Sequence, residues 1–401
     1  MQIGILRETK QPSDRRVPLT PLQCGQLKKQ YAGLGLVVQP SDHRCFSNGE
    51  YLDEGIELQE DLSECDILLG VKEVDIETII GDKTCLFFSH TAKEQPYNRK
   101  LLRAICEKRI TLIDYEYLTR KDKSRVVAFG RWAGIVGAYN GLIAYGRRSG
   151  RYDLTPAWQL SGLDEMKGQL SGLSAGNIRI ALTGGGRVAH GAVEILKSAG
   201  IREVTPDKYL AEQFDEAVFC RLDPWHYTRH REKIEFEFEH FVAHPDQYEN
   251  AFLPYAKRTD LYMACHYWDP DSPVLLGRDD LQLPDLPLRV IADISCDIDG
   301  PIASTVRASS IAEPLYGYDP AAGMETSDLF GDHVVTVMAV DNLPGELPRD
   351  ASADFGEALL EHVVPYLLGA DSEGILERAT IVKEGKLTEE FIYLENYLKG
   401  R

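Results

Sequence analysis

The chain has 401 residues, and its 44 lysines and arginines against 63 aspartates and glutamates give a formal net charge of −19. A nucleic-acid-binding surface needs a dense positive footprint, so this charge balance argues against one. It leaves room for small anionic ligands, because a local pocket of arginine and lysine can form in an acidic protein. The length corresponds to about two domains.

The sequence predicts a cytoplasmic protein. No stretch approaches the roughly 18 continuous apolar residues of a membrane span, and the start, MQIGILRETK, has no signal-peptide apolar region. The eight cysteines are scattered without a CxxC pair. We therefore expect buried free thiols in a reducing compartment.

The first third of the chain alternates strand-like and helix-like segments. Helices are expected from Pro21, where Thr20 is a candidate cap, and over 97–109. Strands are expected over 2–7, 34–40, 65–73, 86–90 and 110–118. Such alternation predicts a parallel sheet covered on both faces, with functional groups gathered beyond the carboxyl ends of its strands.

Charged side chains stand at the ends of several of these strands. His90 comes just after the apolar run LFF and one serine, Lys72 ends ILLGVK, and Glu116 ends LIDYE. Arg16 lies in the loop after the first strand. One such residue is usually a solvated surface charge. Because parallel strands end at one edge of a sheet, four of them favour a shared site.

A signal typical of nucleotide binding begins near the middle of the chain. Residues 126–150 are rich in glycine and alanine, which predicts a long, closely packed helix at a domain junction. A strand then runs into Gly184-Gly185-Gly186-Arg187-Val188-Ala189, and a helix follows. Glycines let a backbone approach a pyrophosphate, and the helix N-terminus stabilises its charge. This context predicts NAD or NADP binding, with a plain glycine-rich turn as the alternative.

The acidic residue of the dinucleotide fold is displaced here. That fold places an aspartate or glutamate at the end of the next strand, where it binds the ribose diol. The next strand-like run, 202–204, is followed by Thr205 and Pro206, and Asp207 comes only after the proline. Asp207 is the candidate, and the choice between NAD and NADP stays open.

Residues 207–255 form an insertion rich in charged and aromatic residues. His226/His230 and His240/His244 have the i, i+4 spacing of metal ligands, but no cysteine or carboxylate completes a set. We expect no metal and a solvated or subunit-contacting excursion. The aspartates of 293–299 do not fit a calcium loop, because the glycine and the terminal glutamate are misplaced.

These elements predict an α/β protein with two Rossmann-like doubly wound domains and a cleft between them. Strands are expected to resume within 260–268, 288–300 and 334–342, and the tail reads as helices that return to the first domain. The first domain, for substrate and catalysis, would then be discontinuous, comprising 1–130 and 350–401. The dinucleotide domain would span 131–349, with the insertion at 207–255.

The chain resembles the alanine dehydrogenase and nicotinamide transhydrogenase superfamily, and within it the lysine-forming saccharopine dehydrogenases. The resemblance is closer still to the lysine–ketoglutarate reductase part of bifunctional aminoadipate semialdehyde synthases. It rests on stretches that follow the family's order along nearly the whole chain: 15–21, 39–72, 87–95, 112–118, 125–134, 266–276, 292–300 and 340–360.

The resemblance implies roles for individual residues. Lys72 and His90 match the catalytic pair. Substrate-binding positions fall on Arg16, Gln95, Phe129, Glu73 and Glu116. Cofactor-binding positions fall on Arg125, Gly184, Gly186, Arg187, Val188, Ala189, Asp207, Val340, Asp341, Asn342 and Leu343.

It also implies a reaction, the reductive condensation of L-lysine with 2-oxoglutarate, or its reverse, with NAD or NADP and no metal. The partners would be small molecules, with no nucleic acid or membrane, in a possible homo-oligomer. Three alternatives stay open: an alanine-dehydrogenase-like or other opine-type enzyme, a nucleotide-binding regulatory protein without turnover, and a transhydrogenase subunit.

Overall fold

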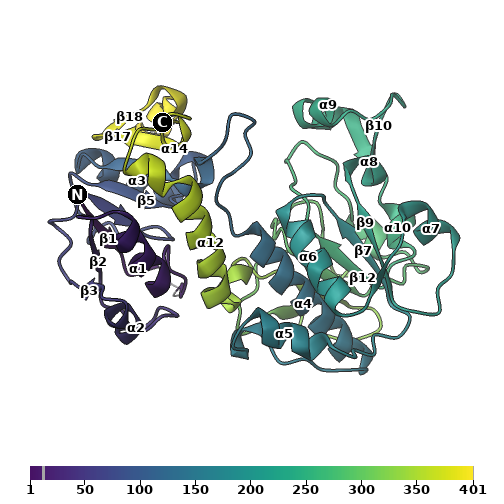
Figure 1. The fold of residues 1–401 in the computed structure, drawn as a ribbon. Coiled ribbons are helices and arrows are strands. Elements are labelled where there is room, and N and C mark those ends of the chain that lie inside the picture. Colours follow the sequence, from purple (N-terminus) through teal and green to yellow (C-terminus); the bar gives the residue numbers. More distant parts are fainter. Residues whose placement is uncertain (11–13, 401) are drawn as a thin grey trace. The chain divides into compact units, whose positions relative to one another are not determined.

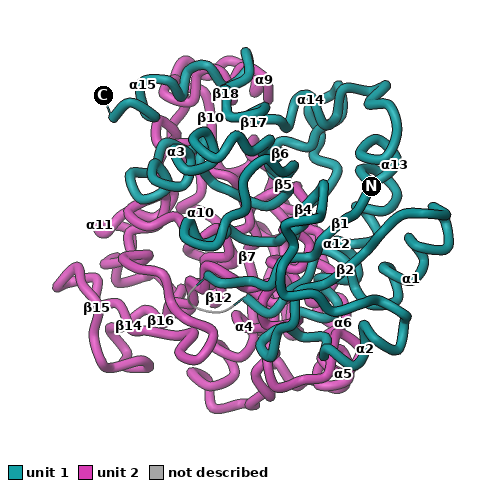
Figure 2. Tube along the Cα trace, turned by 90° about the vertical axis from the view of Figure 1, so that its left-hand side faces the viewer, with its two compact units in different colours: residues 1–129, 348–401 teal, residues 130–347 magenta. Residues whose placement is uncertain are grey.

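The computed structural model describes residues 1–10 and 14–400, which form two compact units (Figure 2). Unit 1 comprises Met1–Phe129 and Pro348–Arg401, and unit 2 comprises Gly130–Leu347. Each unit is built on its own eight-stranded sheet (Figure 1).

The sheet of unit 1 has the strand order β18-β17-β6-β5-β4-β1-β2-β3. The six strands from β6 to β3 are parallel, whereas β17 pairs antiparallel with β6 and β18 with β17. The strands are β1 (Gln2–Ile5), β2 (Gly35–Val38), β3 (Glu57–Leu58), β4 (Ile67–Leu69), β5 (Thr84–Phe87), β6 (Thr111–Asp114), β17 (Thr380–Lys383) and β18 (Lys386–Leu387).

Apolar side chains on both faces of this sheet are covered by helices. One core includes Leu27 of α1 and Phe355 of α12, and the other includes Leu102 of α3 and Leu394 of α15. Thr20 and Gln23 form the capping box that starts α1. The helices are α1 (Pro21–Gln30), α2 (Asn48–Asp53), α3 (Arg99–Glu107), α12 (Pro348–His362), α13 (Val364–Leu367), α14 (Ile375–Ala379) and α15 (Leu394–Lys399).

The sheet of unit 2 has the strand order β15-β14-β16-β13-β12-β7-β9-β8. The strands from β16 to β8 are parallel, and β14 and β15 add an antiparallel edge. The strands are β7 (Arg179–Thr183), β8 (Arg202–Glu203), β9 (Val218–Leu222), β12 (Leu261–Ala264), β13 (Val290–Asp293), β14 (Leu315–Asp319), β15 (Met324–Thr326) and β16 (Val335–Met338).

Small residues let the long helix α4 (Gly130–Ser149) lie close to α6 (Arg187–Ser198), as the sequence predicted. A Cβ at Gly134 would lie 1.8 Å from the carbonyl oxygen of Val188, and one at Gly191 would lie 2.0 Å from that of Arg131. Both positions therefore exclude any side chain. Gly141 brings α4 onto β12 and β13.

The other face of the unit 2 sheet carries shorter helices. These are α7 (Pro206–Ala211), α10 (Leu253–Ala256) and α11 (Arg278–Leu281), while α5 (Leu163–Leu170) lies beside α6. Residues 223–250, which follow the carboxyl end of β9, form α8 (Pro224–Tyr227), α9 (Phe238–Ala243) and a two-stranded ribbon of β10 (Thr228–His230) and β11 (Tyr248–Asn250). Both units are α/β, so the predicted fold class is confirmed. No described helix combines the length and the apolar character needed to cross a bilayer.

Candidate active site

The carboxyl ends of three neighbouring strands bring charged side chains together in unit 1. Lys72 follows β4, His90 follows β5 and Glu116 follows β6. The imidazole of His90 lies between two carboxylates, with Nε2 4.0 Å from Oε1 of Glu73 and Nδ1 3.7 Å from Oε2 of Glu116. The structure therefore joins the ends of β4, β5 and β6 in one cluster.

The backbone fixes the position of His90. Its φ of 52° is left-handed, a conformation that a non-glycine residue adopts only where its surroundings hold it. The preceding residue supplies that support, because the backbone N–H of Ser89 donates to Oδ2 of Asp114 at 2.9 Å and its hydroxyl donates to the same oxygen at 2.5 Å. Burial raises the pKa of Asp114.

Glu116 is the anionic centre of this cluster. Burial works to raise its pKa, but hydrogen bonding with His90 and the charges of Lys93 and Arg125 lower the pKa to about 2. Nζ of Lys93 lies 3.2 Å and Nη2 of Arg125 lies 2.8 Å from Oε1 of Glu116. Glu116 is therefore ionised at neutral pH.

We expect Glu116→Gln to reduce the stability of unit 1 at neutral pH but not in acid. The pKa of Glu116 falls from its usual 4.5 to about 2 in the folded chain, so its contribution is complete above about pH 4.5 and is lost as the pH falls through 2. Hydrogen exchange of peptides from β5 and β6, followed in both proteins at several pH values, measures this difference for unit 1. A difference that stays constant from pH 7 to pH 2 would contradict the assignment.

Lys72 is a partly buried amine whose charge is disfavoured. Burial first, and then the positive charge of Arg16, lower the pKa of Lys72, while Asp14 and Glu73 act in the opposite direction. No hydrogen bond or ion pair of its Nζ is present among the residues that the structure describes. Its backbone N–H donates to Oε2 of Glu8 at 2.9 Å.

Glu8 is a member of this cluster that the sequence reasoning missed. Its carboxylate also accepts the backbone N–H of Val71 at 2.7 Å, so it ties the end of β1 to the end of β4 beside Lys72. Burial raises the pKa of Glu8 to about 8 despite these two bonds. Its place directly after the first strand was the only available signal.

Arg16 is already engaged by another residue of its own loop. Its Nε and Nη2 donate to the two carboxylate oxygens of Asp14 at 3.0 and 2.6 Å, and both side chains are buried. The guanidinium carbon lies 4.1 Å from the ring centroid of Phe129, which stacks on Phe355. Asp14 therefore occupies a bidentate edge of Arg16, which the resemblance places among the substrate-binding residues.

Two further residues predicted to bind substrate, Glu73 and Gln95, differ in whether they contact the Lys72–His90 cluster. Glu73 also forms a salt bridge with Lys10, whose Nζ lies 2.8 Å from Oε2 of Glu73. Gln95 is exposed, and its side chain accepts the hydroxyl of Tyr97. Arg125, expected at the cofactor, belongs to unit 1, where it pairs with Glu116. Within the described residues, no hydrogen bond or ion pair joins the side chain of Gln95 to the Lys72–His90 cluster.

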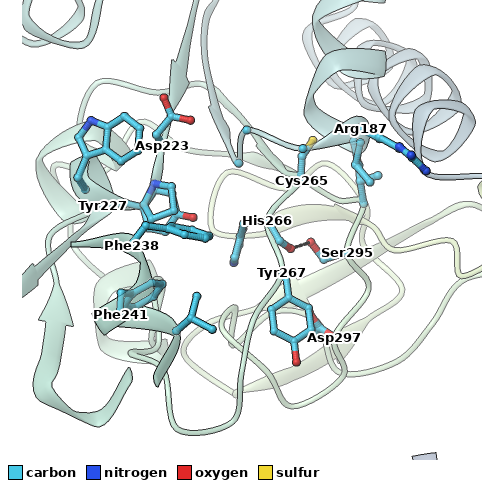
Figure 3. Close-up of a pocket in the computed structure, with 18 residues that line it drawn as sticks. Arg187, Asp223, Tyr227, Phe238, Phe241, Cys265, His266, Tyr267, Ser295 and Asp297 are labelled. Atoms are coloured by element: carbon cyan, nitrogen blue, oxygen red, sulfur yellow. Dashed lines mark hydrogen bonds between the residues drawn. The ribbon is translucent and has the colours of Figure 1, made fainter. Parts of the chain in front are cut away.

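A pocket of about 740 Å³ opens at the glycine turn of unit 2 (Figure 3). Gly184, Gly185 and Gly186 line it together with Arg187 and Val188 at the start of α6. Ala189 lies behind them, fully buried. A volume of this size is typical of cofactor and ligand sites.

The turn has the geometry that a pyrophosphate requires. Gly184 has φ +112°, and a Cβ there would lie 2.6 Å from the carbonyl oxygen of Cys265. A Cβ at Gly186 would instead project into open space, with no described atom within 4 Å. A phosphate can therefore approach this backbone at the N-terminus of the 12-residue helix α6. The residues present fit a dinucleotide.

The strand beside β7 differs from the one that the sequence analysis took as its neighbour. β9 is hydrogen-bonded to β7, and β8 lies beyond it at the sheet edge. Asp207, after β8, is exposed on the first turn of α7 and does not line the pocket. A whole strand, β9, therefore lies between β8 and the glycine strand, and a contact of Asp207 with the ribose stays a prediction. Asp223, which follows β9, lines the pocket instead.

His266, which follows β12, is a second pocket residue that the sequence reasoning missed. Its Nδ1 lies 2.8 Å from the hydroxyl of Thr183, whereas its buried Nε2 has no partner among the described residues. Burial lowers the pKa of His266 to about 4, so the ring is neutral at neutral pH. Val340, Asp341, Asn342 and Leu343 follow β16 and do not line this pocket.

The histidine pairs that have metal-ligand spacing in the sequence do not form a metal-binding cluster among the described residues. Nowhere in residues 1–10 and 14–400 do three or more histidine, cysteine or carboxylate side chains gather as a metal ion requires. His240 lies beside His244, with ring centroids 5.0 Å apart, but its Nδ1 lies 3.0 Å from the hydroxyl of Tyr248.

Known proteins similar to this chain align with nearly its whole length. Residues 4–136 match the family model "Alanine dehydrogenase/PNT, N-terminal domain". The chain is 32% identical to alpha-aminoadipic semialdehyde synthase of Arabidopsis thaliana over 99% of its length, which is 42% of that protein. It is 27% identical to the NAD(+), L-lysine-forming saccharopine dehydrogenase of Neurospora crassa, over 88% of each chain.

A solved structure titled L-alanine dehydrogenase has the same fold, with a TM-score of 0.66 and 16% identity over 99% of this chain and all of that one. The chain spans less than half the length of the semialdehyde synthases that it matches. Residues 4–136 therefore form a domain of the alanine dehydrogenase/PNT N-terminal family, and the chain as a whole is similar to the saccharopine dehydrogenases.

Proposed function

We propose that the protein is an NAD(P)-dependent oxidoreductase that reductively condenses the ε-amine of L-lysine with 2-oxoglutarate, or runs the reverse reaction. The observation that carries this proposal is the cluster at one sheet edge of unit 1. There, an amine with a lowered pKa, Lys72, and His90 between two carboxylates lie on neighbouring strand ends. The substrates follow from the names of the relatives, semialdehyde synthase and L-lysine-forming saccharopine dehydrogenase.

The proposed reaction moves protons at one carbon in several steps. The amine adds to the 2-oxo carbon, the resulting hydroxyl leaves as water, and the imine is reduced to a secondary amine. Lys72 takes the proton from the attacking amine, because burial and Arg16 favour its neutral form. His90 supplies the proton to the departing hydroxyl, and Glu73 and Glu116 orient its ring.

Unit 2 would hold the dinucleotide. The backbone of Gly184–Gly186 and the charge of Arg187 would bind the pyrophosphate at the start of α6, with Val188 and Ala189 closing the turn. Val340, Asp341, Asn342 and Leu343, at the end of β16, are proposed for the nicotinamide half. A bound nicotinamide supplies the hydride for imine reduction or accepts it in reverse.

The test is the loss of reduced-nicotinamide absorbance with purified full-length chain, 2-oxoglutarate and L-lysine. NADH and NADPH are supplied separately, and ammonia or L-alanine replaces lysine in parallel reactions. Oxidation that depends on lysine is the expected result. Oxidation with ammonia but not with lysine would contradict lysine as the substrate and favour an alanine-dehydrogenase-like reaction. Nucleotide binding without oxidation in any of the mixtures would favour a regulatory protein.

A further inference from the structure

A short segment after β18, residues 389–399, lies against the loop of residues 90–98 that follows β5. It consists of a 3-10 turn and the helix α15. Phe391, Leu394 and Tyr397 follow one another at intervals of three residues, so they share one face, and all three are buried. This face packs into the same core as α3, beside which α15 lies (Figure 2). The segment is therefore anchored on unit 1 by its apolar side chains.

The loop that carries His90 is not held in shape by its own backbone alone. His90 and Glu94 have left-handed φ angles of 52° and 54° at the two ends of the turn η1 (Thr91–Lys93). The hydrogen bonds inside this turn are long, because the N–H of Lys93 lies 3.4 Å from the carbonyl oxygen of His90 and that of Glu94 lies 3.3 Å from that of Thr91. Such a conformation persists where contacts from outside fix it.

Two tyrosine hydroxyls of segment 389–399 supply contacts of this kind. Oη of Tyr393 donates to the carbonyl oxygen of Ala92 at 3.2 Å, and Oη of Tyr397 donates to that of Gln95 at 2.5 Å. The partners are 301 and 302 positions apart in the sequence. The loop is therefore held at two points, two and five residues after its histidine.

The same segment also contacts the turn that carries Glu116. Phe391 packs edge-on against Tyr117, with ring centroids 5.1 Å apart. Tyr117 is the last residue of the turn η3 (Tyr115–Tyr117), which contains Glu116. Oε2 of Glu116 lies 3.7 Å from Nδ1 of His90. One segment thus contacts both of the elements whose side chains form this pair.

We propose that Tyr393 and Tyr397 are positioning residues for His90. By holding the loop from outside, they keep the imidazole between Glu73 and Glu116. They act through backbone carbonyl oxygens of the loop and not through the imidazole itself. The inference rests on the proposed function for the acid role of His90, but the position of the loop can be measured without turnover.

Substitution by phenylalanine isolates the contribution of the two hydroxyls. The ring of Tyr397 is 4% exposed and lies 5.1 Å from the guanidinium carbon of Arg99, so a phenylalanine there keeps this packing. Tyr393 is 50% exposed, so its ring contributes less by burial than Tyr397 does. In both variants a carbonyl oxygen of the loop loses its donor while the core stays filled.

The first measurement is hydrogen exchange of peptides from residues 91–98 in the full chain under native conditions. The double variant Tyr393→Phe/Tyr397→Phe is expected to exchange about tenfold faster or more than the wild type, since two hydrogen bonds to the loop are lost. The matched control is Tyr51→Phe in α2, which packs against the edge strand β3. It removes a hydroxyl that donates to the carbonyl oxygen of Leu19 at 2.8 Å, and exchange of residues 91–98 should not change.

The second measurement is lysine-dependent turnover as a function of pH. The double variant is expected to lower kcat about tenfold without changing the KM of the nucleotide, because a displaced acid is less well aligned. The limb on which turnover falls with rising pH should also move to lower pH, because nearby carboxylates favour the protonated ring. These carboxylates belong to Glu73 and Glu116, and the cations that pair with them are Lys10, Lys93 and Arg125. Tyr51→Phe should alter neither kcat nor the profile.

Each outcome decides the proposal. Unchanged exchange of residues 91–98 overturns it, and so does faster exchange with unchanged kcat and pH profile, because the tyrosines would then serve stability alone. If the wild type shows no lysine-dependent oxidation, the proposed function fails, and the reaction of His90 with diethylpyrocarbonate, followed by mass spectrometry, replaces turnover. Faster modification in the double variant supports the inference, and an unchanged rate overturns it. Circular dichroism reports folding, and the two single variants repeat every measurement if the double variant unfolds.

Discussion

Lys72→Met is expected to lower the turnover of lysine-dependent nicotinamide oxidation by about 100-fold or more. Methionine keeps the length and apolar stem of the side chain but removes the amine that the mechanism uses as a base. The pKa of Lys72 is lowered by burial and by Arg16, so wild-type turnover should fall as the pH decreases and this amine becomes protonated. The variant should lose that limb of the pH profile while its nucleotide affinity stays unchanged.

The matched control is Lys83→Met. Lys83 precedes β5 and so lies at the amino end of the strand whose carboxyl end carries His90, at the opposite edge of the sheet. The Lys83→Met variant should therefore retain normal turnover. His90→Gln is expected to act in the same direction as Lys72→Met, with the wild-type fold shown by circular dichroism. Near-normal turnover in both active-site variants would refute the assignment of this pair.

Arg16→Met is expected to lower the free energy of unfolding of unit 1 by about 3–5 kcal/mol. Asp14 is 3% exposed and Arg16 is 2% exposed, so the variant leaves a buried carboxylate without its bidentate partner. It also removes the guanidinium that lies over Phe129. The pKa of Asp14, which Arg16 holds well below its usual range against the effect of burial, should rise.

Because the chain has two units, the measurement must report unit 1 alone. Hydrogen exchange of peptides from β1 and β4 under native conditions gives the opening free energy of this sheet. The double variant Arg16→Met/Asp14→Leu should recover most of the loss, since no unpaired charge stays buried. Arg109→Met breaks an exposed pair with Asp82 and should have little effect. An equal loss in the single and double variants would show that packing, not charge, is responsible.

The sequence predicted the edge of the unit 1 sheet well, because the carboxyl ends of parallel strands are set by chain direction alone. Lys72, His90 and Glu116 could be placed there without knowing the strand order. The pairing of Arg16 with Asp14 could not be predicted from the sequence, because it depends on how one loop folds back on itself. Glu8 was missed for a related reason, because its role depends on which strand becomes the neighbour of β1.

In unit 2 the glycine turn was recognisable, but its acidic partner was not. In chain order the next strand is followed by Asp207, whereas the sheet places β9 beside β7 and leaves the two-residue β8 at the edge. Strand order in an open sheet depends on tertiary packing, and a strand this short carries almost no pattern. Asp223 therefore became visible only through hydrogen bonding between strands.

The return of the chain to unit 1 has a consequence for synthesis on the ribosome. β6 receives its antiparallel neighbour β17 only after all of unit 2 has been translated. At 5–20 residues per second, this leaves the edge of β6 open for on the order of tens of seconds. Unit 2 is continuous in sequence and can fold during that interval, whereas the nascent sheet of unit 1 presents an unpaired edge that a chaperone or another nascent chain could bind.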